Sequence, residues 1–451
     1  MHIFNTLTKV IQKLDLPSNQ QIRIYSCGPT VYEYAHIGNL RSFIMADVLV
    51  RTLKVQGYKV DWVMNLTDID DKTIKGTISE FGNSAEIEQL KTYTQRYAMQ
   101  FFEDLQGVGI DTDQIRFIKV TDVIPQIQEF IENLIEQGFA YKAEDGSTYF
   151  SIEKYQDQFG DYGQLVGQKF LEGKKIGARI KNDEYDKENL SDFALWKAWD
   201  EADAQIYWEH PILGKGRPGW HIECSAINQL AFGGATTDIH TGGIDLIFPH
   251  HTNEIAQSQP LYQPFVNSWV HFEHLLVDGK KMAKSLKNDY RLADLAAKNF
   301  SGLDLRYLYL QSSYRQQTNF TWDALEAAKA GRLKLQSAFS VSSKTDGDAV
   351  AEVMDTPFLA ALNDNLNTAE ALALAHQHKD QLASYEAILG IGLDQATAEI
   401  EIPNNVQILL DQRAAAREAK DFAESDRLRE KIAELGFEVL DTSDGQKVMH
   451  K

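Results

Sequence analysis

The stretch GWHIECSAINQLAFGGATTDIHTGGIDLIFPHHTNE, residues 219–254, decides how the rest of the chain is interpreted. It contains Cys224, which is one of only two cysteines in the sequence. Glu254 follows His250 by four residues, so the two side chains share one face if a helix begins at Pro249. Thiolate, imidazole and carboxylate groups all bind Zn²⁺, but this stretch alone supplies only three such ligands.

The other cysteine, Cys27, lies in the segment YSCGPT, where a predicted strand ends. If the fold brings the two regions together, Cys27 completes a set of two cysteines, one histidine and one glutamate. Four histidines fall in the window 221–251, which contains Cys224 and favours a shared pocket. At this point a functional zinc site, a structural zinc site and a pair of buried free thiols all remain open.

Length and composition restrict the class of protein. The chain has 451 residues, of which 43% are apolar and 24% charged, and several domains are expected at this length. Its longest apolar runs fall short of the ~20 residues of a membrane span, and MHIFNTLTKV lacks the apolar core of a signal peptide. Two cysteines suit a reducing compartment, so we expect a cytoplasmic protein.

The net charge argues against non-specific binding to nucleic acids. The formal net charge is −20, whereas non-specific binding depends on positive charges that neutralise the phosphates of the nucleic acid. A local basic segment is nevertheless present at 280–291, with five basic residues and one acidic residue. Such a patch still allows a specific anionic partner.

A strand–helix–strand pattern begins the chain's organised region. Residues 21–27 and 58–66 read as strands, and apolar residues recur at helical spacing through the segment between them, which Gly57 ends. Such a unit forms a right-handed parallel crossover, with ligands at the carboxyl ends of the strands. Cys27, His36 and residues 67–71 fall at those ends. We therefore expect an α/β, Rossmann-like nucleotide-binding domain.

The remaining segments predict an insertion and a helical C-terminal part. Two β-prone runs flank the turn Asp145-Gly146, and a segment rich in glycine and charge follows at 160–190. From about residue 292 onward the apolar spacing is almost wholly helical, which predicts all-α C-terminal modules. The expected parts are a split domain at 1–112 and 206–275, an insertion at 113–205, a loop region at 276–320, a bundle at 321–400 and a terminal module at 401–451.

Two short motifs predict phosphate binding. HIGN, residues 36–39, places an imidazole and backbone N–H groups at a strand-to-helix junction, although by itself it reads as a helix cap. KMAKS, residues 281–285, carries two lysines that could hold a triphosphate and stabilise charge on a leaving pyrophosphate. A lone lysine pair would be read as a solvated loop. The two motifs together, in this order, favour a nucleotide site.

With these motifs in place, the chain resembles the cysteinyl-tRNA synthetase family of class I aminoacyl-tRNA synthetases over essentially its full length. HIGN and KMAKS stand for the HIGH and KMSKS signatures of class I. The narrower family is indicated by the segments FNTLT, CGPTVY, NLTDIDDK, DFALWK, GRPGWHIECS, FPHHTNEIAQS, NDNLNTAEAL and REAKDFAESDRLREKI. GWHIECS combined with PHHxNE is the most specific of these.

The resemblance implies a role for each matching residue. The implied zinc ligands are Cys27, Cys224, His250 and Glu254. The implied substrate pocket comprises Cys27, Gly28, Thr67, Trp220, His221 and His240. The implied ATP site comprises His36, Gly38, Asn39, Gly242, Asp245 and Lys284, with His36, Asn39, Lys281 and Lys284 as catalytic residues.

The resemblance also assigns the C-terminal module to the anticodon. The implied tRNA contacts are Arg417, Phe422, Asp426 and Asp441. Without the resemblance, the mixed charge of residues 406–433 would be read as a solvated structural helix. Aromatic stacking and polar contacts to base edges are the usual means of reading single-stranded RNA.

Several positions depart from the family pattern, but none removes an implied ligand or clamp lysine. Asn39 replaces the second histidine of HIGH. The other departures are Thr241, Ile244, Thr252, Ala283, Lys287 and Val448. We expect activity to be retained.

The expected reaction has two steps. Cysteine and ATP, with Mg²⁺, form cysteinyl-adenylate, and the cysteinyl group then passes to the 3′ end of cysteine tRNA. One zinc ion per subunit would bind the substrate as thiolate, a bond that serine cannot match, and we expect a monomer. Two alternatives remain: a ligase joining cysteine to an amino sugar, as in mycothiol synthesis, and an RNA-binding paralogue without activity. The helical C-terminal module argues against the first, and the intact ligands and lysines argue against the second.

Overall fold

The computed structural model describes residues 1–17, 19–167, 175–180, 189–342, 353–395, 403–442 and 445–450. Its chain divides into two compact units, Met1–Leu393 and Asp394–Lys451, which are treated separately below. Within the described ranges, every helix is too short or too polar to cross a membrane.

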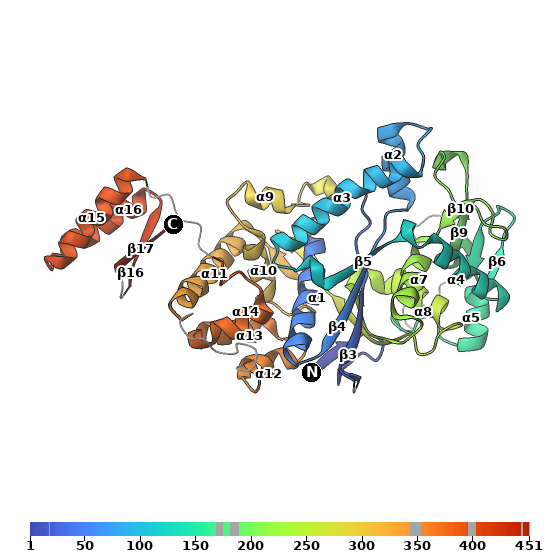
Figure 1. Ribbon diagram of the computed structural model, residues 1–451, viewed down its shortest axis with the longest axis horizontal. Coiled ribbons are helices and arrows are strands. Elements are labelled where there is room, and N and C mark those ends of the chain that lie inside the picture. The colour runs from blue at the N-terminus through green and yellow to red at the C-terminus, as the bar shows by residue number, and fades with distance from the viewer. Residues whose placement is uncertain are drawn as a thin grey trace. The chain divides into compact units, whose positions relative to one another are not determined.

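A five-stranded parallel sheet forms the centre of the first unit (Figure 1). Its strand order is β12-β11-β3-β4-β5, and all four neighbouring pairs are parallel. The strands are β3 (Gln21–Ser26), β4 (Lys59–Leu66), β5 (Ile115–Lys119), β11 (Thr237–Gly243) and β12 (Val266–Phe272). Because both faces of such a sheet are covered, the strands end in buried runs, and the polar residues that follow them meet at one edge. The Rossmann-like prediction is confirmed.

Helix α1 (Ile37–Val55) connects β3 to β4 and starts at a capping box. The Nδ1 atom of His36 accepts the backbone N–H of Asn39 at 3.1 Å, and the Asn39 Oδ1 atom accepts the N–H of His36 at 3.1 Å. These two bonds satisfy backbone donors that the first helical turn leaves open. The capping reading of HIGN is therefore correct, and it places both side chains at the carboxyl edge of the sheet.

Two large apolar clusters and a small one around Trp269 lie among the described residues of this unit. The first includes Ile22, Ile24 and the buried face of α1, and extends to helices near residue 390. The second includes Val63, Ile222 and the insertion. Helices flanking the sheet are α2 (Asp71–Phe81), α3 (Ile87–Gly107), α4 (Ile124–Glu136), α7 (Trp220–Phe232) and α8 (Thr252–Ser258).

A second sheet, inserted between β5 and α7, is mainly antiparallel. Its order is β10-β9-β7-β6, with β8 paired to β9 in parallel. Its elements are β6 (Ala140–Lys142), β7 (Thr148–Phe150), α5 (Ile152–Phe159), β8 (Lys175–Ile180), β9 (Asn189–Ala198) and β10 (Gly216–Pro218). The β6–β7 hairpin confirms the expected turn at Asp145-Gly146.

The insertion differs from the expected range 113–205 at both ends. β5 lies inside that range but belongs to the main sheet, where it pairs with β4. β10 lies beyond the range but pairs with β9. Both assignments depend on which strands pair with one another, which local periodicity does not report.

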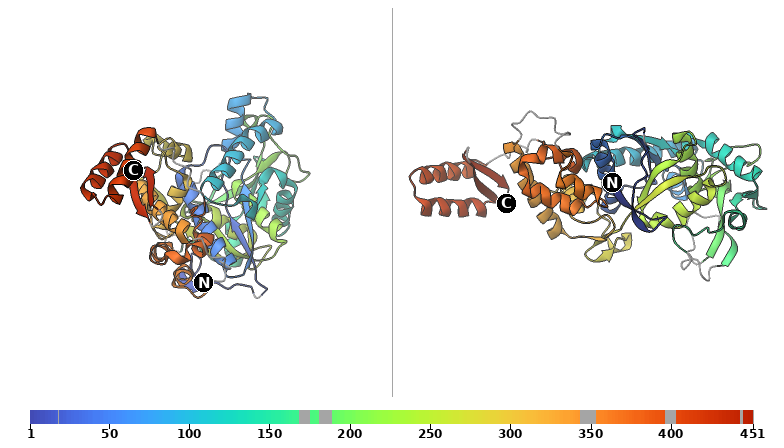
Figure 2. Two further views of the ribbon diagram at one scale, coloured as in Figure 1. Left: turned by 60° about the vertical axis from the view of Figure 1, so that its left-hand side comes forward. Right: turned by 90° about the horizontal axis from the view of Figure 1, so that it is seen from below.

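The rest of the first unit extends the sheet region with short strands and helices. Helices α10 and α14 contact α1, as the yellow to orange helices in Figure 2 indicate. The elements are β1 (His2–Asn5), β2 (Val10–Lys13), β13 (Leu275–Val277), β14 (Lys280–Lys281), α9 (Leu292–Ala296), α10 (Gly302–Leu310), β15 (Thr318–Phe320), α11 (Trp322–Ser342), α12 (Pro357–Asn363), α13 (Thr368–Gln377) and α14 (Leu382–Leu389).

The described residues of the second unit form two helices and a pair of antiparallel strands. These are α15 (Asn404–Glu418), α16 (Phe422–Glu434), β16 (Phe437–Thr442) and β17 (Gly445–His450). A small apolar cluster of its own includes Val406, Ile432 and Val439. The helical C-terminal region is thus confirmed, with a hairpin that the helical spacing did not predict.

Candidate active site and metal centre

The N-terminus of α1 borders a cavity of about 380 Å³. His36, Gly38 and Asn39 line it on one side, and Lys281 and Met282 line it from the region after β12. A Cβ atom on Gly38 would lie 3.2 Å from the Met282 Cε atom, so glycine permits the close approach. Both predicted nucleotide motifs therefore meet in one cavity.

The cap of α1 fixes the tautomer of His36. Because Nδ1 accepts the N–H of Asn39, the ring proton of the neutral form resides on Nε2. Burial lowers the pKa of His36, which favours this neutral form. The ring thus offers one N–H donor at the helix N-terminus, where anions bind.

Lys284 has a different partner from Lys281. Its ammonium forms an ion pair with Glu33 and lies 5.6 Å from the ring centre of Tyr32. The Lys284 side chain is 66% exposed, so the pair can exchange for another anion at low cost. The two signature lysines are therefore held in different surroundings.

The glycine-rich turn after β11 places its residues on two sides. Gly243 and the exposed Asp245 line the cavity. Gly242 instead faces the histidines, because a Cβ atom there would lie 2.6 Å from the His251 Cε1 atom. Of the two residues predicted to contact ATP here, Asp245 borders the cavity and Gly242 lies behind it.

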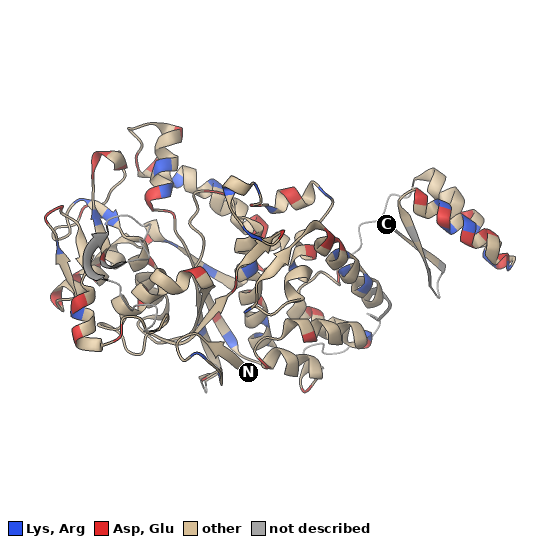
Figure 3. Ribbon diagram, turned by 180° about the vertical axis from the view of Figure 1, so that it is seen from behind, with Lys and Arg blue, Asp and Glu red and all other residues tan. Residues whose placement is uncertain are grey.

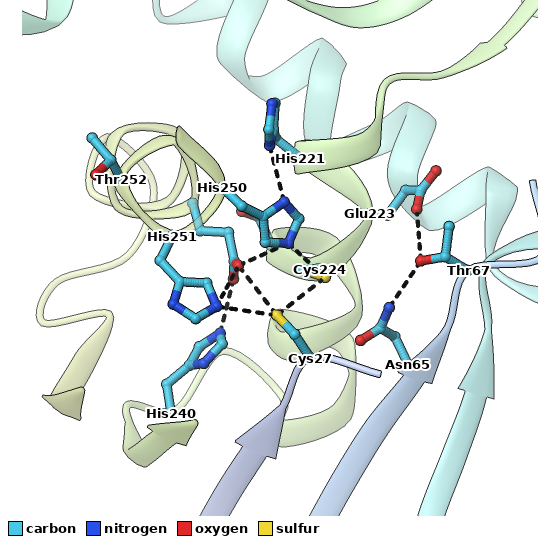
Figure 4. A network of polar contacts seen from close by, with 12 residues as sticks. Cys27, Asn65, Thr67, His221, Glu223, Cys224, His240, His250, His251 and Thr252 are labelled. Atoms are coloured by element: carbon cyan, nitrogen blue, oxygen red, sulfur yellow. Dashed lines mark hydrogen bonds and ion pairs between the residues drawn. The ribbon is translucent and has the colours of Figure 1, made fainter. Parts of the chain in front are cut away.

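The four predicted zinc ligands come together below the cavity (Figure 4). The Sγ atoms of Cys27 and Cys224 are 3.8 Å apart, and the His250 Nε2 atom is 3.3 Å from the Cys224 Sγ atom. The Glu254 Oε1 atom is 3.3 Å from His250 Nε2 and 3.6 Å from the Cys27 Sγ atom. His250 and Glu254 lie on one face because the helical backbone that follows the extended residue Phe248 (φ −138°, ψ 129°) runs directly into α8.

This donor set fits a zinc ion. Two thiolates bound at about 2.3 Å in a tetrahedron lie about 3.8 Å apart, as the two cysteines do. Burial raises the pKa of the Cys27 thiol, and the nearby Cys224 and Glu254 raise it further. Burial also lowers the pKa of His250 to about 3, which leaves a neutral imidazole suited to metal ligation. A cation would offset the cost of the buried anionic groups.

A second, overlapping set shares two of these residues. Cys27, His240, His251 and Glu254 also bring one ligand atom each within 4.8 Å of the others. His251 Nε2 is 3.3 Å from the Cys27 Sγ atom, and His240 Nε2 is 3.0 Å from the Glu254 Oε2 atom. The first set contains both thiols and is therefore the better match to zinc.

The predicted substrate residues fall into exposed and buried groups. Gly28 and Trp220 line the cavity, and the Trp220 ring centre is 4.4 Å from that of His250. His221, a neighbour of His250 at 2.9 Å between Nδ1 atoms, is buried. Thr67 and His240 are at most 1% exposed and do not line the cavity.

Some residues of this region were missed by sequence reasoning. His251 Nδ1 contacts His271 Nε2 at 2.7 Å, and the other ring nitrogen of His271 contacts the hydroxyl of Thr6 at 2.7 Å. His251 is one of the four histidines that the sequence placed in a shared pocket, so the residues that were missed are His271 and Thr6. Glu33 and Asn65 carried no comparable signal.

The predicted tRNA residues lie in the second unit. Arg417 and Asp426 are exposed on α15 and α16, and Phe422, the first residue of α16, is 61% exposed. Asp441 belongs to β16, and its side chain lies outside the described part of the structure. Both signs of charge occur along these helices (Figure 3). Arg413 is buried and donates to the Gln446 Oε1 atom at 2.8 Å, so it supports the hairpin.

Comparison with known proteins agrees with this geometry. Residues 13–330 match the family model of the class I (C) tRNA synthetase catalytic domain, and residues 400–448 match the cysteinyl-tRNA ligase anticodon binding domain. A cysteine–tRNA ligase of Chlamydia caviae is 42% identical over 99% of this chain and 97% of its own length. One of Chlamydia muridarum is 41% identical over 99% of both chains.

Solved structures share the fold at low sequence identity. A methionyl-tRNA synthetase of Mycobacterium tuberculosis in complex with methionyl-adenylate superposes with a TM-score of 0.55 and 15% identity, over 91% of this chain and 88% of that chain. This similarity concerns the fold alone. By its catalytic-domain match and its full-length relatives, the chain belongs to the cysteine–tRNA ligase family of class I aminoacyl-tRNA synthetases.

Proposed function

We propose that this enzyme activates L-cysteine with ATP and transfers the cysteinyl group to the 3′ end of cysteine tRNA. One observation carries the proposal: Cys27 lines the cavity that contains both nucleotide motifs and also belongs to the cluster of metal ligands. An amino acid whose side chain reaches Cys27 would therefore have its carboxylate in the nucleotide cavity.

In the activation step, a carboxylate oxygen of cysteine attacks the α-phosphorus of ATP, and the bond to pyrophosphate breaks. The Nε2–H group of His36 and the amide of Asn39 donate to phosphate oxygens at the N-terminus of α1. Lys281 and Lys284 stabilise the charge that develops on the pyrophosphate. Lys284 first leaves its ion pair with Glu33 and then binds the triphosphate. Asp245 accepts from ribose hydroxyls, and Mg²⁺ enters with ATP.

Cys27, Cys224, His250 and Glu254 would hold the zinc ion. When bound, zinc supplies a bond to the substrate thiolate that the hydroxyl of serine does not match at neutral pH. Trp220 and Gly28 shape the adjoining part of the cavity. An apolar pocket alone discriminates poorly between cysteine and serine, which have nearly the same shape. With the zinc bond, the specificity for cysteine would need no editing step.

In the transfer step, a hydroxyl of the terminal ribose of tRNA attacks the carbonyl carbon of cysteinyl-adenylate, and AMP leaves. The match of residues 400–448 to an anticodon binding domain supports tRNA as the acceptor. We propose that Arg417, Phe422, Asp426 and Asp441 contact the anticodon. We further propose that the enzyme acts as a monomer.

Cysteine-dependent ATP–pyrophosphate exchange tests the proposal, with serine as the control substrate and a cysteine tRNA transcript added in a second stage. Exchange with cysteine but not serine, followed by charging of the transcript, is the expected result. Exchange without charging would point to an amino-sugar ligase. Absence of exchange in a protein that still binds the transcript would indicate an RNA-binding paralogue.

A further inference from the structure

A chain of three hydrogen bonds runs beside the candidate metal site, and Figure 4 shows the two that join Asn65, Thr67 and Glu223. The backbone N–H of Gly28 donates to the Asn65 Oδ1 atom at 2.8 Å. The Asn65 Nδ2 atom donates to the Thr67 Oγ1 atom at 3.0 Å, and that hydroxyl donates to the Glu223 Oε2 atom at 3.3 Å. We call Asn65, Thr67 and Glu223 the strut. All three are at most 1% exposed.

The two ends of this hydrogen-bonded chain, Gly28 and Glu223, are covalently attached to the two cysteines of the candidate metal site. Gly28 directly follows Cys27, and Glu223 directly precedes Cys224. The strut therefore spans the same gap as the two Sγ atoms, which are 3.8 Å apart. It joins the end of β3, the end of β4 and the first turn of α7, and the sequence separates Gly28 from Glu223 by almost two hundred residues.

The direction of each bond in the strut is determined. A backbone N–H can only donate, so it selects the oxygen of the Asn65 amide and turns the NH₂ group toward Thr67. The hydroxyl of Thr67 accepts there and sends its single proton to the carboxylate of Glu223. Replacement of any member by a residue of the wrong hydrogen-bonding type breaks the sequence of donors and acceptors.

The strut is placed to act through other residues. The backbone of Thr67 is also fixed, because its N–H donates to the carbonyl of Pro29 at 3.1 Å and its carbonyl accepts from Val31 at 3.0 Å. Gly28 approaches the same strand so closely that a Cβ atom would lie 1.8 Å from the Asn65 carbonyl oxygen. The cysteine-bearing loop is thus held against the end of β4.

We infer that Asn65, Thr67 and Glu223 are positioning residues that hold Cys27 and Cys224 at the spacing of a metal-bound pair. This inference rests on the proposed zinc-dependent function. Partners that orient metal ligands commonly contribute about 10- to 100-fold to metal affinity. Such partners usually bond to the ligand side chain itself. The strut instead acts on the backbone of the residue next to each cysteine.

The test compares Thr67→Val with Thr67→Ser in the full-length enzyme. Valine keeps the shape but removes the hydroxyl, whereas serine keeps the hydroxyl. Thr52→Val is the matched control, because Thr52 is fully buried and its hydroxyl bonds the Val48 carbonyl in α1 at 2.7 Å. Zinc affinity is measured by competition with a chromogenic chelator, and Co²⁺ substitution reports thiolate ligation by its absorption band.

We expect Thr67→Val to weaken zinc binding about 10-fold, and Thr67→Ser and Thr52→Val to stay within about 2-fold of the wild type. The KM for cysteine should rise in Thr67→Val, with the KM for ATP unchanged. If Thr67→Val fails to fold, Asn65→Asp decides. Aspartate still accepts the N–H of Gly28 but cannot donate to Thr67, so zinc binding should again weaken.

The possible outcomes separate this inference from the proposed function. Wild-type enzyme that binds zinc, together with Thr67→Val and Asn65→Asp variants of undiminished affinity, overturns the strut alone. Wild-type enzyme that is active without zinc overturns the metal part of the proposed function and the strut together. Equal losses in Thr67→Val and Thr67→Ser would show that packing, not the hydroxyl, matters, and would also overturn the inference.

Discussion

At the scale of single residues, the site depends on a few positions where the backbone approaches another segment closely. Gly28 is the clearest of these, because its Cα hydrogen points at the carbonyl oxygen of Asn65 on β4. The contact lies beside Cys27, so a shift of this loop moves a thiol of the metal cluster. Gly28, which has no side chain, thereby controls the position of the Cys27 thiol.

We expect Gly28→Ala to reduce cysteine-dependent exchange at least tenfold. The new Cβ atom would lie 1.8 Å from a backbone oxygen, and backbone cannot move aside as a flexible side chain can. Overpacking of this kind costs about 1–3 kcal/mol, most of it through displacement of the loop. Gly107→Ala is the control, because its Cβ atom would meet only the Leu292 side chain at 3.4 Å. Equal exchange by the two variants would contradict the prediction.

A buried carboxyl group, Asp104 on α3, gives a pH-dependent prediction. Burial raises its pKa to about 6, although a hydrogen bond from Gln100 at 3.2 Å opposes the change. The unfolded value is about 3.9, so the folded protein binds this proton more tightly. The contribution of Asp104 to the free energy of unfolding therefore rises as the pH falls from about 6 to about 4. Above pH 6 the buried carboxylate is ionised and destabilises the folded protein.

Asp104→Asn should consequently stabilise the enzyme at pH 8 and not at pH 4. The full pKa difference corresponds to roughly 3 kcal/mol, and residual hydration of the carboxylate reduces the expected gain to about 1 kcal/mol. Urea unfolding at the two pH values measures the difference. A gain of the same size at both values would trace the effect to packing and not to ionisation.

At the scale of elements, buried ion pairs connect α1 with the helices that follow the sheet. The Oδ2 atom of Asp47 accepts from Arg51 at 2.8 Å and from the fully buried Arg306 of α10 at 2.5 Å. Arg306 also donates to the carbonyls of Leu389 and Val108. This network fixes the helix whose N-terminus carries the nucleotide motif HIGN.

We expect Asp47→Ala to lower the free energy of unfolding by about 3–5 kcal/mol, because it leaves the buried charge of Arg306 without its carboxylate. The comparison is Glu80→Ala, which breaks a pair with Arg96 in which both side chains are more than 40% exposed. Exposed pairs contribute about 0–1 kcal/mol. Chemical denaturation of both variants checks the contrast, and similar losses would exclude the network as a stabilising feature.

The sequence predicted the elements whose signals are local. The strands β3 and β4, the helix between them and the turn at Asp145-Gly146 all have a periodicity or a turn motif of their own. The expected bounds of the insertion placed β5 and β10 on the wrong sides of it, because sheet membership depends on strand pairing and not on local periodicity. The four residues of the candidate metal site were predicted from residue types and a family pattern, whereas Asn65 and Glu223 look like ordinary strand and helix residues until β4 and α7 are brought together.

At the scale of the whole molecule, the two units suit the two halves of the proposed reaction. The cavity and the four residues of the candidate metal site all lie in Met1–Leu393. The match to an anticodon binding domain falls in the other unit, which has an apolar cluster of its own. Activation of cysteine should therefore be independent of changes on the surface of the second unit, whereas recognition of tRNA should depend on them.

Phe422 is the residue at which this division can be tested. It starts α16 with 61% of its surface exposed, an arrangement suited to stacking on an unpaired base. Stacking contributes about 1–3 kcal/mol per base, so Phe422→Ala should raise the KM for cysteine tRNA about 5- to 100-fold. Ile408→Ala on α15 is the control, because Ile408 is 50% exposed but cannot stack in this way. Both variants should retain wild-type rates of ATP–pyrophosphate exchange, since every residue of the nucleotide cavity is intact. Loss of exchange in Phe422→Ala would mean that the two units are coupled in the first step, and equal charging by both variants would remove Phe422 from the tRNA-binding surface.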